Sequence, residues 1–262
     1  LQPVPPRRIV IASGAEGGLY ARYAQRYREI LARDGVTLDI RPTQGSGQNL
    51  ELLLDPTSDV DIAFIQGGLA HLADGDRLEM LAALYYEVLW IFQRPDASFT
   101  QLNQFRGQRI AVGGKGSGTQ AFALPLLQAN GLDPKDATFI EVGGEGALDL
   151  VRDGRADVAL VVGGGAMTSV QRALRDPRVK LMSVQRAAAY ARRFPYITRL
   201  TLPAGTIDLA HDVPAEDVEL IGTKAMLVAR TSLHPALVNL LLEAVRDEHD
   251  DQGYFEAAGE FP

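Results

Sequence analysis

The chain has 262 residues, of which 46% are hydrophobic, and it carries a formal net charge of −7 and no cysteine. Its basic residues are scattered, which argues against a nucleic-acid-binding surface, because such surfaces rely on clustered Lys and Arg. The absence of cysteine excludes disulfides, thiolate nucleophiles and zinc–cysteine sites. No apolar run approaches the roughly 18 residues that indicate a membrane span. The length and hydrophobic content allow two modest cores.

Two segments of the sequence, residues 8–65 and 109–162, resemble each other. In each, a hydrophobic strand runs into a glycine-rich loop and a helix, a second strand and loop follow, and an acidic, β-branched strand closes the segment. This order places helix N-termini at the carboxyl ends of parallel strands, where free N–H groups and the helix dipole attract anions. The repeat therefore predicts four such N-termini and two similar α/β lobes that bind something anionic.

The elements predicted for the first copy are, in chain order, a strand at 8–12, a helix at 19–31, a strand at 36–41, a short helix ending before Pro56, and a strand at 59–64. Side chains and glycines near the ends of these strands are candidates for contact with a ligand: Ser13, Gly18, Tyr20, Ser46, Asn49 and Gln66. Four of them have a structural alternative of similar weight: a helix cap for Ser46 and Asn49, core packing for Tyr20 and loop packing for Gln66.

A strongly apolar strand at 85–92 precedes the second copy, and the turn Arg94-Pro95-Asp96 follows it. We therefore expect lobe I to comprise residues 1–92 and 220–262, and lobe II to comprise residues 93–219. The second copy repeats the order of elements, with strands beginning near 109, 139 and 156 and with helices after the loops 113–119 and 143–146.

The loop Lys115-Gly116-Ser117-Gly118-Thr119 gives the sharpest local signal, because it supplies consecutive N–H donors, two hydroxyls and a neighbouring ammonium group. It could cradle one carboxylate or phosphate, and the alternative of a tight turn with a hydroxyl cap has about equal weight. Gly164, within a glycine triplet, holds the position in lobe II that corresponds to Gln66 in lobe I. That triplet allows close approach either to a ligand or to another helix.

Nucleotide-binding motifs fit this loop poorly. Lys115 precedes Gly-Ser-Gly instead of standing directly before Ser or Thr, so the P-loop pattern is not met. In the dinucleotide-binding pattern Thr119 replaces the third glycine, although Glu141 ends the next strand at about the required distance. A nucleotide-dependent enzyme therefore stays a weak alternative.

Catalytic and metal-ligating patterns are lacking in the sequence. The four histidines, His71, His211, His234 and His249, stand far apart and match no metal-ligand spacing, so we expect surface or loop positions for them. His249-Asp250-Asp251 is interpreted as a solvated charge run. The sequence predicts no catalytic residue, no metal and no cofactor, and it favours a binding protein over an enzyme.

Several motifs together resemble one family over nearly the whole chain: Ile11–Gly14 with Gly17–Tyr20, Gly45–Leu50, Ala83–Tyr85, Val112–Thr119 and Leu202–Thr206. This combination resembles the TAXI solute-binding proteins of TRAP transporters. The resemblance implies a two-lobed, class II periplasmic binding protein-like α/β fold in which each lobe is a mainly parallel sheet flanked by helices. It implies a periplasmic location and a ligand cleft between the lobes that closes by a hinge.

The resemblance also implies the ligand and the partner: a glutamate-like amino acid or dicarboxylate, delivered to the membrane subunit of a TRAP transporter. By position, Ser46, Asn49 and the Gly116–Thr119 loop would contact that ligand, and Tyr85 belongs to one of the shared motifs.

Two features depart from the family pattern. Ala21 stands where the family usually has a second aromatic residue, so that wall of the expected pocket lacks this ring. Residues 255–262 resemble a subgroup in which more chain, including a membrane anchor, follows the soluble domain. In such an anchored protein the domain could serve a transporter, or act as a ligand sensor or scaffold, and the sequence leaves both open.

Overall fold

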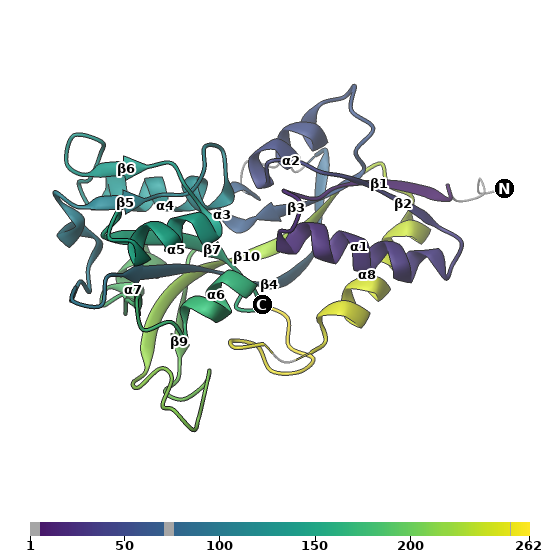
Figure 1. The fold of residues 1–262 in the computed structure, drawn as a ribbon. Helices are drawn as coiled ribbons and strands as arrows, with labels where there is room; N and C mark the ends of the chain where they lie inside the picture. Colours follow the sequence, from purple (N-terminus) through teal and green to yellow (C-terminus); the bar gives the residue numbers. More distant parts are fainter. Residues whose placement is uncertain (1–5, 71–75, 252) are drawn as a thin grey trace. The chain divides into compact units, whose positions relative to one another are not determined.

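The computed structural model of the chain describes residues 6–70, 76–251 and 253–262, which form two compact units (Figure 1). Unit 1 comprises Leu1–Tyr85, Lys224–Gln252 and Glu256–Pro262, and unit 2 comprises Tyr86–Thr223 and Gly253–Phe255. The chain passes from unit 1 to unit 2 within strand β4 (Leu78–Gln93) and returns within strand β10 (Val218–Arg230). The expected crossings, after residue 92 and before residue 220, fall within these same two strands.

Unit 1 is built around three parallel strands. Its elements are β1 (Arg8–Ala12), α1 (Leu19–Ala32), β2 (Thr37–Arg41), α2 (Ser46–Leu54), β3 (Ile62–Gln66), α3 (Gly67–Ala70), the first part of β4, the last part of β10, and α8 (Pro235–His249). Strand β1 pairs in parallel with β2 and β3, and β3 pairs antiparallel with Ala225–Ala229 of β10. Helices α1 and α8 pack against each other and bury their apolar sides in one core with this sheet.

Unit 2 repeats the same order. Its elements are the rest of β4, η1 (Leu102–Phe105), β5 (Arg109–Ala111), α4 (Gly118–Ala129), β6 (Thr138–Ile140), α5 (Gly144–Arg152), β7 (Val158–Gly163), α6 (Thr168–Ala173), β8 (Lys180–Leu181), α7 (Ala187–Arg193), β9 (Thr198–Leu202) and the first part of β10. Strand β5 pairs in parallel with β6 and β7, while β7 and β8 pair antiparallel with β4, and β9 with β10.

The two units therefore share the order β-α-β-α-β, formed by β1-α1-β2-α2-β3 in unit 1 and by β5-α4-β6-α5-β7 in unit 2. Helices α1, α2, α4 and α5 each begin after a strand of a parallel set. This confirms the α/β class, the repeat and the four helix N-termini. The segment between β8 and β10, which contains α7 and β9, has no counterpart in the predicted elements.

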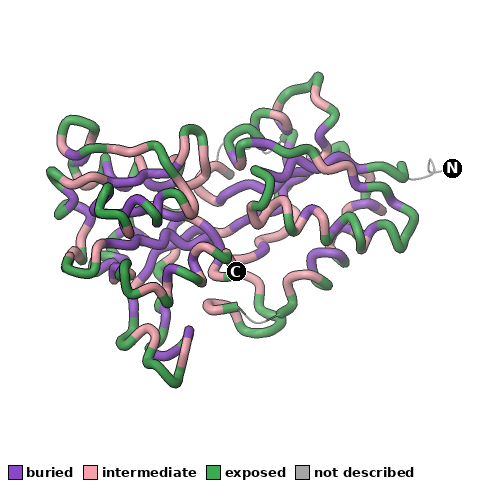
Figure 2. Tube along the Cα trace, in the orientation of Figure 1, coloured by how far each residue is buried: buried purple, intermediate pink, exposed green. Residues whose placement is uncertain are grey.

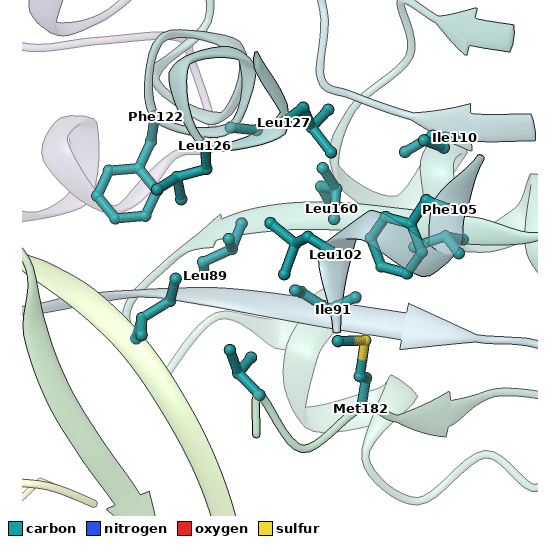
Figure 3. Packing of buried hydrophobic residues seen from close by; sticks show 14 of the residues in the cluster. Leu89, Ile91, Leu102, Phe105, Ile110, Phe122, Leu126, Leu127, Leu160 and Met182 are labelled. Atoms are coloured by element: carbon teal, nitrogen blue, oxygen red, sulfur yellow. The ribbon is translucent and has the colours of Figure 1, made fainter. Parts of the chain in front are cut away.

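Apolar side chains from both faces of the unit 2 sheet fill its core. Figure 3 shows one cluster, in which Phe122, Leu126 and Leu127 of α4 lie over Leu89 and Ile91 of β4. All five side chains are almost fully buried. Burying a side chain of this size stabilises a fold by about 1.5–3 kcal/mol. This packing fixes α4, and therefore the loop that precedes it, against the sheet.

An aspartate at the start of the closing strand has the same role in both units. A carboxylate oxygen of Asp61 accepts the N–H of Val10 at 2.8 Å, and one of Asp157 accepts the N–H of Arg109 at 2.8 Å. Asp157 also binds the Arg109 guanidinium, and these hydrogen bonds lower the pKa of its carboxyl group. Burial raises the pKa of Asp61 instead. The acidic closing strands of the repeat are thus explained by hydrogen bonds to the first strand of each copy, β1 or β5.

Candidate functional site

The loop between β5 and α4 of unit 2 folds back on itself. Gly113 has φ +94°, and a Cβ atom there would lie 2.8 Å from the Ser117 hydroxyl oxygen and 2.8 Å from the Cβ of Thr119. Only glycine fits such a position without strain. The turn therefore brings the Ser117 and Thr119 side chains over the end of β5.

Both hydroxyls of this loop retain a proton that they can donate. The Ser117 hydroxyl caps α4 by accepting the N–H of Gln120 at 3.2 Å, and the Thr119 hydroxyl accepts the N–H of Val162 at 3.1 Å. A hydroxyl group that accepts one hydrogen bond still carries its own O–H donor. Ser117 and Thr119 are thus fixed by the backbone and can each donate to an anion.

The first turn of α4 adds backbone donors. The N–H of Ala121 is bound by the Ser117 carbonyl, whereas the bonds among the described residues include none for the N–H groups of Gly118 and Thr119. No acidic residue stands in this turn, so the positive end of the helix dipole is not neutralised locally. Lys115 lies exposed beside it. Four donors and one cation are therefore available around the start of α4.

The side chain of Gln120 links this loop to the next. Its carbonyl accepts the N–H of Gly116 at 3.0 Å, and its amide donates to Glu141 at 3.1 Å. The loop after β6 packs directly on the β5–α4 loop, since a Cβ at Gly143 would lie 3.1 Å from the Gly114 nitrogen. The sequence did not single out Gln120, although its place three residues after the hydroxyl cap could have suggested a role in the first turn.

Helix α5 offers no comparable anion site. Glu145 stands in its first turn and complements the helix dipole, and it is bound in turn by the Arg152 guanidinium at 2.6 Å. The sequence predicted equivalent anion-binding helix N-termini after β5 and after β6. In unit 2 the arrangement favours the one that begins α4.

Unit 1 gathers its predicted polar residues around the start of α2. The hydroxyl of Ser46 accepts the N–H of Gln66 at 3.0 Å and lies 3.4 Å from the Tyr20 hydroxyl. The Tyr20 ring stacks on Phe64 with centroids 5.0 Å apart. Tyr20 is half-buried, and its hydroxyl lies beside that of Ser46.

Asn49 and Ser13 hold this arrangement together from inside. The amide nitrogen of Asn49 donates to the carbonyls of Ser13 at 2.7 Å and Phe64 at 2.8 Å, and its oxygen accepts from Thr43 at 2.5 Å. Asn49 and Ser13 are both 0% exposed. The Asn49 amide and the Ser13 carbonyl form their hydrogen bonds within the chain, and these bonds fix the ends of β1 and β3 against α2. Thr43, which completes this set, carried no signal in the sequence.

The remaining predicted residues lie at different places. Gly18 caps α1, and Tyr85 is the last residue of β4 within unit 1, where its ring lies 5.2 Å from that of Tyr23. Gly164 is buried, and its carbonyl accepts the N–H of Met167. A Cβ on either flanking glycine of its triplet would collide with Met167 or Tyr254. These collisions support close packing as the reason for the flanking glycines.

One histidine prediction is wrong. His249 lies at the end of α8 against the rings of Tyr23, Tyr27 and Tyr85, and it is hydrogen-bonded to the Tyr27 hydroxyl at 2.8 Å. Burial lowers the pKa of His249 to about 4. It is therefore a packed, neutral histidine instead of part of a solvated run, because α8 carries it onto α1.

The other histidines have simpler surroundings. His234 caps α8 by accepting the N–H of Ala236, and His211 is exposed beside Asp208. His71 lies outside the described residues. Over the described parts of the chain, no three acidic or histidine side chains are placed to hold a metal ion.

The chain belongs to the NMT1-like family, whose model matches residues 11–260. The fold is that of periplasmic binding proteins, as solved structures show. The alkanesulfonate-binding protein SsuA from Xanthomonas axonopodis pv. citri, bound to MOPS, is similar with a TM-score of 0.53 and 15% identity, over 93% of this chain and 73% of that one.

Two further solved structures share this fold. An ancestral arginine-binding protein bound to arginine has a TM-score of 0.57 and 12% identity, over 96% of both chains. A structure described as a periplasmic transporter has a TM-score of 0.57 and 14% identity, over all of this chain and 91% of that one. In the part of the chain that the structure describes, none of the helices has the length and apolar character required to cross a bilayer.

Proposed function

We propose that this protein is a periplasmic solute-binding protein that captures a small anionic solute, namely a glutamate-like amino acid or a dicarboxylate. We further propose that it delivers the solute to the membrane subunit of a TRAP-type transporter. The observation that carries the proposal is the start of α4, where two hydroxyls and two backbone N–H groups can donate and no acidic side chain stands in the first turn. The TAXI-like motifs support the class of transporter.

The proposed anion contact is one carboxylate bound by Ser117, Gly118 and Thr119, with Lys115 nearby. Hydrogen bonds to a charged group contribute about 1.5–3 kcal/mol each. Three or four of them match the roughly 8 kcal/mol of micromolar binding, before the cost of ordering the solute is subtracted. The net charge of −7 does not prevent this, since charges farther than about 8 Å are screened at physiological salt.

Residues of unit 1 would contact the same solute. We propose that Tyr20 and Ser46 do so, with Gly18, Gln66 and Tyr85 as further contacts, while Ser13 and Asn49 position them from inside. Gly164 of unit 2 is proposed as a backbone contact. Two solved structures with this fold hold a sulfonate buffer molecule and an amino acid. Both kinds of molecule carry an anionic group, a sulfonate in one and a carboxylate in the other.

A thermal unfolding screen tests the proposal. The panel contains amino acids, dicarboxylates, sulfonates, phosphates and nucleotides. A ligand present at about one hundred times its dissociation constant adds about 2.7 kcal/mol, which raises the midpoint of a chain of this size by roughly 5–10 °C. We expect such a rise with a small carboxylate. A rise with nucleotides alone would favour a nucleotide-dependent enzyme, and no rise with any compound would contradict solute binding and favour a sensor or scaffold domain.

Two serines of unit 2 provide a matched pair of variants for the site. The hydroxyls of Ser117 and Ser183 each accept one backbone N–H, but only Ser117 belongs to the proposed site. Ser117→Ala is expected to weaken binding at least about tenfold, and Ser117→Leu to abolish it, because the hydroxyl donor is lost and the bulk covers neighbouring N–H groups. Ser183→Ala is expected to retain the affinity. Equal effects of the two alanine variants would refute the assignment of the site.

A further inference from the structure

A long connection in unit 2 between β9 and β10 is ordered by its own hydrogen bonds. We call residues 203–217 the acidic loop; it runs out beyond β9 and returns (Figure 1). The N–H of Gly205 donates to the Pro214 carbonyl at 2.8 Å, and that of Ile207 donates to the Val213 carbonyl at 2.9 Å. A preformed loop loses little conformational freedom when a partner binds it.

The acidic loop exposes one large apolar side chain among carboxylates. Leu209 is 85% exposed, the largest value among the exposed large apolar side chains of the described residues. Figure 2 shows that most of the turn around it is exposed. The loop carries four carboxylates and no Lys or Arg: Asp208, Asp212, Glu216 and Asp217. An ordered acidic loop with an exposed leucine fits a partner that offers apolar surface bordered by cations.

Such a surface lies in the same unit. A hollow of about 690 Å³, which we call the arginine hollow, is lined by four arginines and two aspartates, together with Ala166 and Pro177 among its uncharged residues. One of the arginines, Arg172, is 66% exposed, and its one ion pair among the described residues is a 4.0 Å contact with Glu145. The hollow thus has the opposite charge to the acidic loop.

The loop and the hollow are neighbours on one protomer. Arg175, which lines the hollow, donates to the Ile207 carbonyl of the loop at 3.0 Å. Leu209 is nevertheless exposed, so the loop does not bury it in the hollow of its own copy. Two adjacent, complementary features are what a two-fold interface requires, because each copy then offers its loop to the hollow of the other.

We propose that two copies of this chain associate through unit 2, each placing its acidic loop against the arginine hollow of the other. The contact buries Leu209 and sets the loop carboxylates against Arg172 and Arg175, since Arg178 is already paired with Asp176. It is separate from the start of α4, so the association does not depend on the proposed solute site.

Sedimentation velocity of the purified chain, at concentrations up to about 200 µM, tests this proposal. We expect a reversible monomer–dimer equilibrium that weakens several-fold when the salt concentration is raised, since exposed ion pairs are screened. Leu209→Asp is expected to weaken the dimer at least about tenfold. Met80→Asp is the matched control, because Met80 is 60% exposed in unit 1, outside both the loop and the hollow.

A mixing experiment separates this reciprocal contact from other dimers. At a concentration near the dissociation constant of the wild-type dimer, Arg172→Glu alone and Leu209→Asp alone are each expected to be mostly monomeric, whereas a mixture of the two restores weaker association. In the mixed pair, the intact loop of one variant meets the intact hollow of the other. A wild-type chain that stays monomeric would overturn the proposal, and so would a dimer that Leu209→Asp and Met80→Asp affect equally.

Discussion

His249 makes the stability of unit 1 depend on pH in a way that a single substitution reveals. Its ring lies against those of Tyr23, Tyr27 and Tyr85, and it is held by the Tyr27 hydroxyl. Burial lowers its pKa from an ordinary value of 6.5 to about 4. Replacement by Gln keeps a polar side chain near Tyr27 but removes the titrating group.

The sign and size of the effect follow from this pKa. Between pH 6.5 and pH 4 the unfolded chain binds a proton at His249 that the folded chain does not, so the free energy of unfolding falls as the pH is lowered. Each pKa unit corresponds to 1.36 kcal/mol, which gives a loss of about 3 kcal/mol once the pH is below 4. Above pH 6.5 the neutral His249 contributes this full amount to the free energy of unfolding.

Urea unfolding of wild type and His249→Gln, measured from pH 8 to pH 4, isolates this contribution, because the carboxyl groups that titrate in the same range are common to both proteins. We expect the wild type to lose about 3 kcal/mol more than the variant over this range. His211→Gln, which removes an exposed histidine, serves as the control for the exchange of a histidine for glutamine, and its loss should be closer to that of the wild type than to that of His249→Gln. Parallel curves for the wild type and His249→Gln would refute the argument that His249 is buried and neutral.

Two further substitutions test how the loops are supported. Asn49→Ala removes the bonds to two buried carbonyls and should lower the free energy of unfolding by about 3 kcal/mol, whereas a change below about 1 kcal/mol in a urea titration would contradict the supporting role. Gly113→Ala should cost about 2 kcal/mol and weaken solute binding, because its Cβ would collide with Ser117 and Thr119. Gly116→Ala is the control, because Gly116 also has a positive φ but a Cβ atom there would meet no neighbouring atom. This substitution should lower the free energy of unfolding by about 1 kcal/mol. Equal losses of stability for the two variants would contradict the collision at Gly113.

The repeated part of the fold was predictable because its signals are local. Each strand of the repeat runs into glycines that must turn the chain, and a helix with regular apolar spacing follows. The proposed site at the start of α4 could be selected from the sequence for the same reason, since its hydroxyls and glycines are consecutive. Glu145 follows the Gly143-Gly144 turn directly in the sequence, whereas its ion pair with Arg152, seven residues further along α5, is shown only by the structure.

Contacts between distant residues account for what the sequence missed. The hydrogen bonds of Asn49 to the carbonyls of Ser13, which follows β1, and Phe64 of β3 join distant parts of the sequence, so its complete burial was not foreseen. His249 looked solvated because its neighbours in sequence are charged, whereas its surroundings come from α1 and β4. The unit boundaries lie inside β4 and β10, the two strands in which the expected crossings also fall.

The most direct test of the central claim is an amide NMR titration of the ¹⁵N-labelled chain with the carboxylate that stabilises it most in the unfolding screen. If the start of α4 holds the anionic group, the N–H signals of Gly118 and Thr119 should move downfield and be among the largest shifts, because each amide then donates to a charged oxygen. Saturable binding that leaves both signals in place would show that the solute is held elsewhere, and it would contradict the account.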